Sequence, residues 1–439
     1  MSLLRDGVAP RMRPLSPNRA ALVSALDIGT SKIACLVARL KPRATQDVLP
    51  RRSHSIEIIG IGHIRSRGIK GGAITNLDEA EEAIRHAVAA AERMAGAQID
   101  SVVVSVSSGR VASDLYAATV HVPGPMVADG DIERVLSAGS RHSVRGGRAV
   151  LHSLPIGYAL DDARGIREPR GMLGKRLGVD MHVATVDAAA ARNLMLCVER
   201  CHLSVEAMVA SPYVSGLAAL TDDEADLGAA VIDLGAGTTT LAVFANGHFV
   251  HADGFALGGR HVTMDIARGI NARVSDAERI KTLYGSVLSG SADERDMITV
   301  SPSSEERDAP QIVSRATLVR IIKPRAEEIL EWVRDRLAAS PLATDPRGHV
   351  VLTGGASQLN GLPELASRIL GRQVRIGRPL GFSGLPEAAK GASFSVAAGM
   401  LVYPQLAYLE HFEPRSSRRM MTGTDNYLSR VGRWLRESF

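Results

Sequence analysis

The sequence contains few of the residues from which several kinds of fold and site are built. Three cysteines in 439 residues cannot form a disulfide framework. Cys197 and Cys201 are one helical turn apart, but no second pair of Cys or His at ligand spacing accompanies them. No secretory signal opens the chain, and no run of about 18 apolar residues could span a bilayer. We therefore expect a cytoplasmic protein with reduced thiols.

Aromatic residues are also scarce, at 4%, although 45% of the residues are hydrophobic. The core must therefore be built from Ala, Val, Leu and Ile, which is typical of α/β proteins with buried strands. The formal net charge of +5 is concentrated near the chain ends, which suggests an anionic partner, either nucleic acid or lipid headgroups. Residues 1–19 are basic and proline-containing with little apolar periodicity, and we predict a disordered N-terminal extension.

An internal repeat organises the rest of the chain. The segments ALDIGTSKIACLV and VIDLGAGTTTLAVF each combine an apolar strand, an Asp-x-Gly turn rich in Thr or Ser, and a second apolar strand. Asp27 and Asp233 hold equivalent positions in the two copies. Between them, from about residue 109 to 180, short strands separated by turns predict a small inserted α/β module. The pattern indicates two related α/β halves.

The repeated turns carry residues suited to phosphate binding. Glycines let the backbone approach a phosphate and point its amides at the oxygens, and hydroxyls add donors. A carboxylate at the strand end, Asp27 or Asp233, is placed to hold a hydrated Mg²⁺. One such turn is weak evidence, but two copies can clasp a triphosphate from both sides. The predicted phosphate-binding residues are Gly29, Thr30, Ser31, Lys32, Gly235, Gly237, Thr238 and Thr239.

Two further segments are candidates for the nucleoside. The stretch VVLTGGASQLNGL contains Gly354, Gly355 and Ser357, and its glycines allow a flat base or ribose to lie against the backbone. Glu278 and Lys281 lie at i and i+3 on one face of a predicted helix. On spacing alone, this second pair is a surface salt bridge.

Together these motifs resemble the actin-like ATPase superfamily, which includes actin, the sugar kinases, MreB and the heat-shock ATPase chaperones. LDIGTSK and IDLGAGTTT are similar to its phosphate turns, LTGGASQLNG to its adenosine turn, and AERIK to the helix whose Glu and Lys hold the ribose and base. More narrowly, LDIGTSKI, GIKGGAITNLDEA, RGIREPRGMLGKRLGVDMHV and LTGGASQLNGL resemble the FtsA family of bacterial cell-division proteins.

The resemblance covers about residues 20–439 and implies an α/β fold of the actin-like (ribonuclease H-like) type. This is a duplicated two-domain fold with an inserted small α/β subdomain and a C-terminal amphipathic helix. The expected parts are subdomain IA at 20–100 with 184–226 and 393–412, the inserted IC at 101–183, IIA at 227–258 with 318–392, IIB at 259–317, a linker at 413–425 and the helix at 426–439.

The resemblance also implies a function. The chain is expected to bind ATP and Mg²⁺ and to polymerise head to tail on the cytoplasmic face of the inner membrane at the division site. There it would anchor FtsZ filaments through FtsZ's C-terminal peptide and recruit later division proteins through IC, with no nucleic acid as partner. Arg315, Arg320 and Lys323 are expected contacts of the FtsZ peptide, with an ordinary solvated helix face as the alternative.

Other readings of the same fold stay open. An MreB-like or pilus-assembly actin relative shares the phosphate turns, whereas a small-molecule kinase needs a catalytic Asp that the sequence does not clearly offer. Ser211-Pro212 stands where several actin relatives have the Gln or Glu that orients the attacking water, and a hydroxyl is a weaker base than a carboxylate. We therefore expect at most a slow ATPase without a small-molecule substrate.

The C-terminal sequence NYLSRVGRWLRESF is amphipathic. On a helix its apolar residues fall within one stripe and its arginines on the other side, which suits a lipid interface with anionic headgroups. Packing on the protein's own body or on a partner helix is the alternative. The predicted membrane-binding residues are Tyr427, Leu428, Arg430, Val431, Arg433, Trp434, Leu435, Arg436 and Phe439.

Overall fold

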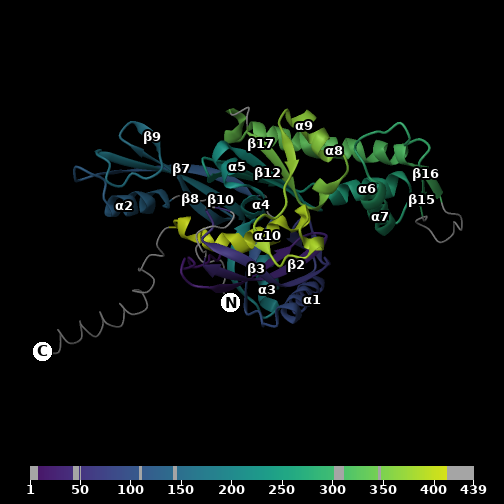
Figure 1. Ribbon diagram of the computed structural model, residues 1–439, viewed down its shortest axis with the longest axis horizontal. Coiled ribbons are helices and arrows are strands. Elements are labelled where there is room, and N and C mark those ends of the chain that lie inside the picture. Colours follow the sequence, from purple (N-terminus) through teal and green to yellow (C-terminus); the bar gives the residue numbers. More distant parts are fainter. Residues whose placement is uncertain are drawn as a thin grey trace. The chain divides into compact units, whose positions relative to one another are not determined.

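Figure 1 shows a computed structural model, which describes residues 8–42, 49, 51–107, 111–141, 146–300, 311–344 and 348–412. The predicted linker at 413–425 and amphipathic helix at 426–439, with all nine predicted membrane-binding residues, lie outside these ranges. Among the described helices, none combines the length and apolar character needed to cross a bilayer. The chain forms two compact units, the first from the described parts of residues 1–114, 144–152 and 182–408, and the second from those of 115–143, 153–181 and 409–439.

The first unit contains two large sheets with the same internal order. The first sheet, β11-β6-β1-β2-β3-β19, consists of β1 (Ala21–Ile28), β2 (Lys32–Pro42), β3 (His54–Arg65), β6 (Ser101–Val106), β11 (Ser204–Ala210) and β19 (Phe382–Ser383). The second, β14-β13-β12-β17-β18, consists of β12 (Ala229–Leu234), β13 (Thr239–Ala245), β14 (His248–Phe255), β17 (His349–Thr353) and β18 (Val374–Ile376).

The strand directions confirm the internal repeat. In each sheet an antiparallel meander, β1-β2-β3 or β12-β13-β14, is extended on the other side by parallel strands, β6 and β11 or β17 and β18. The central strands are apolar runs that are buried along most of their length, as strands covered on both faces should be. The structure therefore has the duplicated α/β halves that the sequence predicts.

Helices cover both sheets. The helices of the first unit are α1 (Leu77–Ala95), α3 (Ala188–Arg200), α4 (Ser211–Ala219), α5 (Asp222–Leu227), α6 (Gly259–Gly269), α7 (Val274–Tyr284), α8 (Arg315–Ala338), α9 (Leu362–Leu370) and α10 (Ser395–Val402). Helix α1 packs on β2 and β3, whereas α10 packs on β1 and on α4, which in turn contacts β12 and β13 (Figure 1). Helices α4 and α10 thus form the buried layer between the two sheets.

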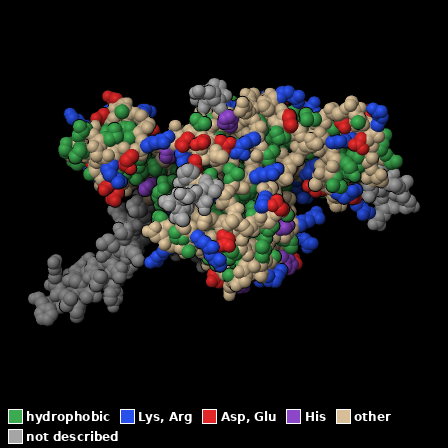
Figure 2. Space-filling model, in the orientation of Figure 1, with side chains coloured by type: hydrophobic (Ala, Val, Ile, Leu, Met, Phe, Trp, Pro, Cys, Tyr) green, Lys and Arg blue, Asp and Glu red, His purple; other side chains and the backbone are tan. Residues whose placement is uncertain are grey.

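Two small pairs of strands complete the first unit. They are β4 (Ile69–Lys70) with β5 (Ala73–Ile74), and β15 (Met297–Val300) with β16 (Gln311–Ser314). Strand β16 leads directly into α8, whose first turn is capped by the Ser314 hydroxyl accepting from the Thr317 amide. On the face drawn in Figure 2, acidic and basic side chains are interspersed.

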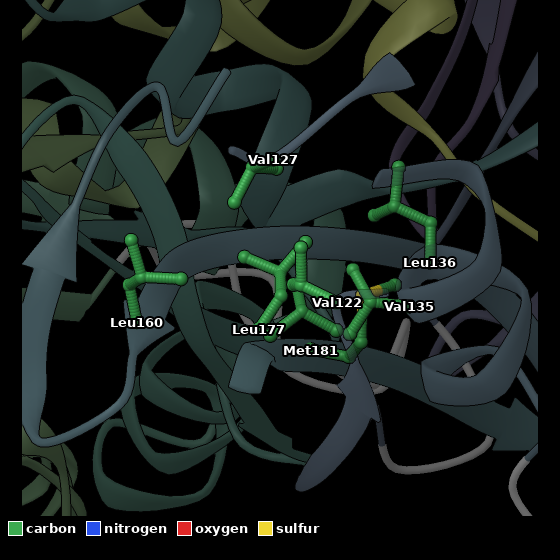
Figure 3. Close-up of a cluster of buried hydrophobic side chains, with 8 residues drawn as sticks. Val122, Val127, Val135, Leu136, Leu160, Leu177 and Met181 are labelled. Atoms are coloured by element: carbon green, nitrogen blue, oxygen red, sulfur yellow. The ribbon is translucent and has the colours of Figure 1, made fainter. Parts of the chain in front are cut away.

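The second unit is built on the sheet β7-β10-β8-β9, with β7 (Ala112–His121), β8 (Arg148–Leu160), β9 (Ala163–Ile166) and β10 (Arg176–Asp187), and on helix α2 (Asp129–Gly139). Figure 3 shows its core, in which apolar side chains of the sheet and of α2 meet; the cluster contains Val122, Val127, Val135, Leu136, Leu160, Leu177, Val179 and Met181. This unit corresponds to the predicted insertion. Strand β6, however, belongs to the first sheet, so the insertion begins after Val106 and not at residue 101.

The described part of the N-terminal extension also differs from the predicted disorder. Val8 forms a parallel bridge with Val150, and the Ala9 amide donates to the Val150 carbonyl at 2.9 Å. The Pro10 carbonyl accepts from the Met208 amide at 2.9 Å, on the edge strand β11. The composition of this segment predicts a disordered, solvent-exposed chain. In the structure, however, Val8 and Ala9 pair with the backbone of β8, and Pro10 pairs with the backbone of β11.

Candidate nucleotide site

The two repeated Asp-Gly turns adopt the same closed hairpin. The Gly29 amide donates to the Lys32 carbonyl at 3.0 Å, and the Gly235 amide donates to the Thr238 carbonyl at 2.9 Å. A Cβ atom at Gly29 would lie 2.8 Å from the Lys32 carbonyl oxygen, and one at Gly235 would lie 2.9 Å from that of Thr238. Both turns therefore need glycine for the same steric reason, and the repeat extends to backbone geometry.

The two hairpins meet at their tips. A Cβ at Gly237 would lie 2.4 Å from the Thr30 hydroxyl oxygen, and that oxygen accepts from the Gly72 amide at 3.0 Å. Between them lies a cavity of about 870 Å³. Its walls include most of the predicted cofactor and metal residues: Asp27, Gly29, Thr30, Ser31, Lys32, Asp233, Gly235, Gly237, Thr238, Glu278, Lys281, Gly354 and Gly355.

The two aspartates share one electrostatic environment inside this cavity. Burial raises the pKa of Asp27, against the effects of the Ser105 hydroxyl, which donates to Asp27 Oδ1 at 2.7 Å, and of Lys32. Burial and the nearby Asp27 raise the pKa of Asp233 from 3.8 to about 7, and Lys32 again opposes the rise. Burial lowers the pKa of Lys32 to about 8, although both carboxylates favour its charge. Lys32 alone therefore does not balance the charge of the two buried carboxylates, and the pair is suited to binding a cation.

Lys32 contacts a segment that is more than 350 residues away in the sequence. Its ammonium donates to the Ser393 carbonyl at 2.8 Å and lies 3.4 Å from the centre of the Phe394 ring. Both contacts favour the charged form and fix the side chain in the cavity wall. The lysine of the first hairpin thus ties β1 and β2 to the segment that precedes α10.

The third glycine turn lies directly against Asp233. Gly354 has φ of +85°, and a Cβ there would lie 2.4 Å from Asp233 Oδ1 and 2.5 Å from the Leu234 carbonyl oxygen. Glycine is therefore required both for the backbone conformation and for the close approach. Ser357 does not line the cavity: its hydroxyl is buried and donates to the Gly354 carbonyl at 2.7 Å, which stabilises the turn.

Glu278 and Lys281 form more than a surface ion pair. The Lys281 ammonium lies 2.8 Å from Glu278 Oε2, 2.8 Å from the Thr263 hydroxyl and 3.1 Å from the Gly259 carbonyl. The hydroxyl of Thr263, a buried residue of α6, also bonds Glu278 Oε2. Burial raises the pKa of Glu278, but Lys281 and Thr263 outweigh it and hold that pKa below its usual range. The pair is therefore fixed in the cavity wall by a residue that the sequence does not single out.

The remaining predicted binding and partner residues, which are Thr239, Arg315, Arg320 and Lys323, do not lie together at one site. Thr239 lies behind the second hairpin, where its hydroxyl donates to the Leu257 carbonyl at 2.8 Å. Arg315, predicted as a partner contact, lines the cavity at the start of α8, with Nε 3.8 Å from an Asp293 oxygen. Arg320 and Lys323 make contacts within α8, to Thr317 at 3.0 Å and Glu327 at 3.9 Å. The three basic residues therefore have different local partners, and their role as a peptide contact stays a prediction.

Sequence reasoning missed several residues that support or line the cavity. Ser105, which bonds Asp27 from behind the cavity wall, is a polar residue after three valines in strand SVVVSV, and this is a readable signal. Arg65 and Arg260 line the cavity, but they carry no local pattern that distinguishes them from other surface arginines. Among the described residues, no group of three or more His, Cys, Asp or Glu is arranged as a metal site, so Asp27 and Asp233 stand as a pair.

Comparison with known proteins identifies the family. A family model described as Cell division protein FtsA matches residues 230–399, and a model of the SHS2 domain inserted in FtsA matches 108–185. Cell division protein FtsA of Rhizobium meliloti (strain 1021) is 55% identical over 431 residues, which is 98% of each chain. That of Escherichia coli (strain K12) is 33% identical over 425 residues, 95% of this chain and 98% of that one. The chain belongs to the FtsA family of cell division proteins.

Solved structures agree on the fold. The PilM-PilN type IV pilus biogenesis complex matches with a TM-score of 0.58 at 17% identity, covering 87% of this chain and 98% of that one. MreB5 of Spiroplasma citri bound to ADP matches with a TM-score of 0.52 at 15% identity, covering 88% and 97%. These likenesses confirm the predicted actin-like fold. The MreB and pilus-assembly alternatives thus share the fold, whereas membership of the FtsA family follows from sequence identity.

Proposed function

We propose that this cell division protein binds ATP with Mg²⁺ in the cavity between its two Asp-Gly hairpins. The observation that carries the proposal is the meeting of duplicated turns around one pair of buried carboxylates, Asp27 and Asp233. The structures of MreB5 of Spiroplasma citri bound to ADP and bound to AMPPNP support nucleotide binding by a chain of this fold.

Each part of the cavity has a role in this proposal. The glycine turns at Gly29 and Gly235 bring backbone amides to the phosphates, and the Thr30 and Thr238 hydroxyls add donors. Asp27 and Asp233 would hold a hydrated Mg²⁺, an ion that prefers oxygen ligands and needs only one or two carboxylates from a protein. Bound Mg²⁺ supplies charge neutralisation for the phosphates. Glu278 and Lys281, fixed by Thr263, face the ribose and base, and the Gly354–Gly355 turn leaves room for the flat base.

Binding can be measured directly. Isothermal titration calorimetry with ATP and Mg²⁺ on the full chain should give one site per chain. Asp27→Asn should weaken Mg²⁺-dependent binding, because it removes one of the two carboxylates. Asp226→Asn is the matched control, since Asp226 forms an exposed ion pair with Arg51 away from the cavity. Failure of the wild-type chain to bind any nucleotide would refute the proposal.

We further propose that the chain attaches to the cytoplasmic face of the inner membrane through residues 426–439 and polymerises there. The amphipathic pattern of this segment supports the attachment. One short helix binds reversibly, but copies linked in a filament bind with avidity. Polymerisation and membrane attachment should therefore strengthen each other.

Vesicle co-sedimentation tests the membrane proposal. The full chain should pellet with anionic vesicles more than with neutral ones, and a chain ending at Thr424 should stay in solution. Trp434→Glu, in the predicted apolar stripe, should release the protein. Ser429→Glu is its matched control, because the same charge is added on the predicted polar side. Equal pelleting of the full and shortened chains would exclude the anchor.

The proposed partner on the filament is the C-terminal peptide of FtsZ, bound near subdomain IIB, with later division proteins bound through IC. Arg320 and Lys323 support it because their charges lie on α8, directly after the segment predicted as subdomain IIB. Fluorescence anisotropy with a labelled peptide should show weaker binding to Arg320→Glu and Lys323→Glu. Arg334→Glu, in an exposed contact with Asp335 further along α8, is the control. Unchanged affinity in the first two variants would place the peptide elsewhere.

A further inference from the structure

The first sheet has a second edge, at the strand ends that are remote from the nucleotide cavity. Strand β1 begins there at Ala21, which pairs with Leu40 near the end of β2, and Pro42 of β2 pairs with His54 at the start of β3. The cavity lies at the other end of β1, where Gly29 follows the strand. Strand β1 has eight residues and is therefore about 25 Å long. This second edge, which we call the basal edge, takes no part in the proposed nucleotide site.

Basic side chains gather at the basal edge. In the register of β2 and β3, Arg39 lies opposite Glu57 and Lys41 lies opposite Ser55, so the two cations share one face of the sheet. Glu57 Oε2 is 3.7 Å from an Arg39 nitrogen and 2.7 Å from the Lys41 ammonium, and the two basic side chains are 50% and 52% exposed. Arg19, which is exposed two residues before β1, adds another charge. Three cations thus accompany one carboxylate in this group of residues.

An exposed apolar side chain lies among these charges. Leu22 is 50% exposed and lies opposite Arg39 in the register of β1 and β2. A single exposed leucine is common on protein surfaces. Here, however, it shares a face with Arg39 and Lys41, and apolar side chains next to basic ones suit an interface with anionic lipid.

The C-terminal end of the first unit also lies at the basal edge. The amide of the buried His54 donates to Gln405 Oε1 at 2.9 Å, and His54 Nε2 lies 3.0 Å from the Arg19 carbonyl oxygen. The unit ends three residues after Gln405, at Tyr408, which is 59% exposed. Tyrosine favours the boundary between lipid and water. One buried histidine therefore joins the N-terminal segment and the C-terminal end of the unit at this edge.

The length of the following chain limits how far the basal edge can lie from the proposed membrane helix. Residues 409–425 separate Tyr408 from that helix. Even a fully extended chain of this length spans no more than about 60 Å. A helix at 426–439 that lies in lipid therefore keeps the basal edge near the bilayer, where anionic headgroups attract exposed cations.

We propose that the basal edge is a second membrane contact of this protein, with anionic lipid headgroups as its partner. This inference rests on the proposed attachment through residues 426–439, which brings the edge to the bilayer. Arg19 and Lys41 bind the headgroup phosphates, and Leu22 and Tyr408 lie at the boundary of the lipid. The contact determines which end of the first sheet faces the membrane, so the nucleotide cavity lies at the end that faces away from it.

Vesicle co-sedimentation of the full chain tests the inference, with neutral phosphatidylcholine vesicles and with vesicles rich in phosphatidylglycerol. The double variant Arg19→Ala, Lys41→Ala should need at least about tenfold more anionic lipid for half-maximal binding, because each basic residue near the surface contributes about fivefold. On neutral vesicles the variant and the wild type should differ less than about twofold. Added salt should reduce the difference on anionic vesicles, since it screens exposed charges.

The double variant Arg334→Ala, Lys390→Ala is the matched control. It removes the same two residue types, which are 50% and 52% exposed and pair with Asp335 and Glu387. Neither lies at the basal edge: Arg334 is on α8, which packs on α6 and α9, and Lys390 is two residues before Ala392 of the cavity wall. Thermal unfolding of both double variants checks that the fold is intact.

The outcomes separate this inference from the proposed attachment. If the full wild-type chain pellets with neither kind of vesicle, the proposed attachment fails and the second contact fails with it. If the wild type pellets and Arg19→Ala, Lys41→Ala binds anionic vesicles equally well, the basal edge faces solvent or a soluble partner, and the lipid contact is excluded while the helix remains the anchor. If the control variant loses as much binding as the test variant, the effect is one of net charge, and the inference is again overturned.

Discussion

Asp233 should destabilise the nucleotide-free protein, and its replacement by asparagine should stabilise it. Burial and the nearby Asp27 raise the pKa of Asp233 from 3.8 to about 7. A raised carboxyl pKa means that the folded state binds the proton more tightly than the unfolded state does. The corresponding stabilisation is fully present below pH 4 and is lost as the pH rises to about 7. Asp233→Asn is nearly isosteric and removes this titration.

The size of the effect follows from the same two pKa values. A difference of about three pH units corresponds to about 4 kcal/mol, which is an upper bound because the Asp27 and Lys32 charges adjust to the substitution. The gain of Asp233→Asn over the wild type should be near zero at pH 4. It should grow up to pH 7 and stay constant above it.

Urea denaturation at several pH values measures this difference, with the two proteins compared at each pH. Asp226→Asn is the control, and as an exposed partner of Arg51 it should change stability by less than about 1 kcal/mol. With Mg²⁺ and ATP present the order should reverse, because the wild-type chain gains more from the ligand. A loss of stability in nucleotide-free Asp233→Asn at pH 8 would refute the assignment of an under-neutralised carboxylate pair.

Two further substitutions and one deletion test the geometry of the cavity and of the N-terminal segment. Gly354→Ala should lower the free energy of unfolding by about 1–3 kcal/mol and also weaken ATP binding, because the added Cβ would meet Asp233. Gly371→Ala is the control: with φ of +64° and open space around it, it should lower the free energy of unfolding by about 1 kcal/mol and leave binding unchanged. Thermal unfolding measures the stability of both variants, and calorimetry measures their binding. Thr263→Val should weaken ATP binding by freeing Glu278 and Lys281, and Thr263→Ser should restore it; equal affinity in the valine variant would contradict the positioning role. Deleting residues 1–10 should speed hydrogen exchange of the Met208 amide, which the Pro10 carbonyl protects, and an unchanged rate would show that this contact does not persist in solution.

The features that could be predicted from the sequence are those with a local pattern. Both Asp-Gly hairpins were readable because the apolar strands, the turn glycines and the hydroxyls are contiguous, and the repeat made chance agreement improbable. Thr263 was not readable, since its role depends on how α6 packs against α7. Strand β19 is two residues long and pairs with β3 across more than 300 positions, which no periodicity signals. The sequence predicts Arg315 as a contact of a partner peptide, whereas the structure places it at the start of α8, where it lines the cavity.

The charged groups of the cavity bear on how fast the proposed site would hydrolyse ATP, which the sequence predicts to be slow. Lys281 already has three protein acceptors, and Lys32 is bonded to the Ser393 carbonyl. The two lysines therefore leave the buried carboxylates without full neutralisation, which would favour an incoming cation. Ser211, which lines the cavity, carries a hydroxyl that cannot serve as a strong base for water. Under the proposed function, such a site would consume a bound triphosphate slowly, and the nucleotide would act mainly as a link between hairpins from the two halves.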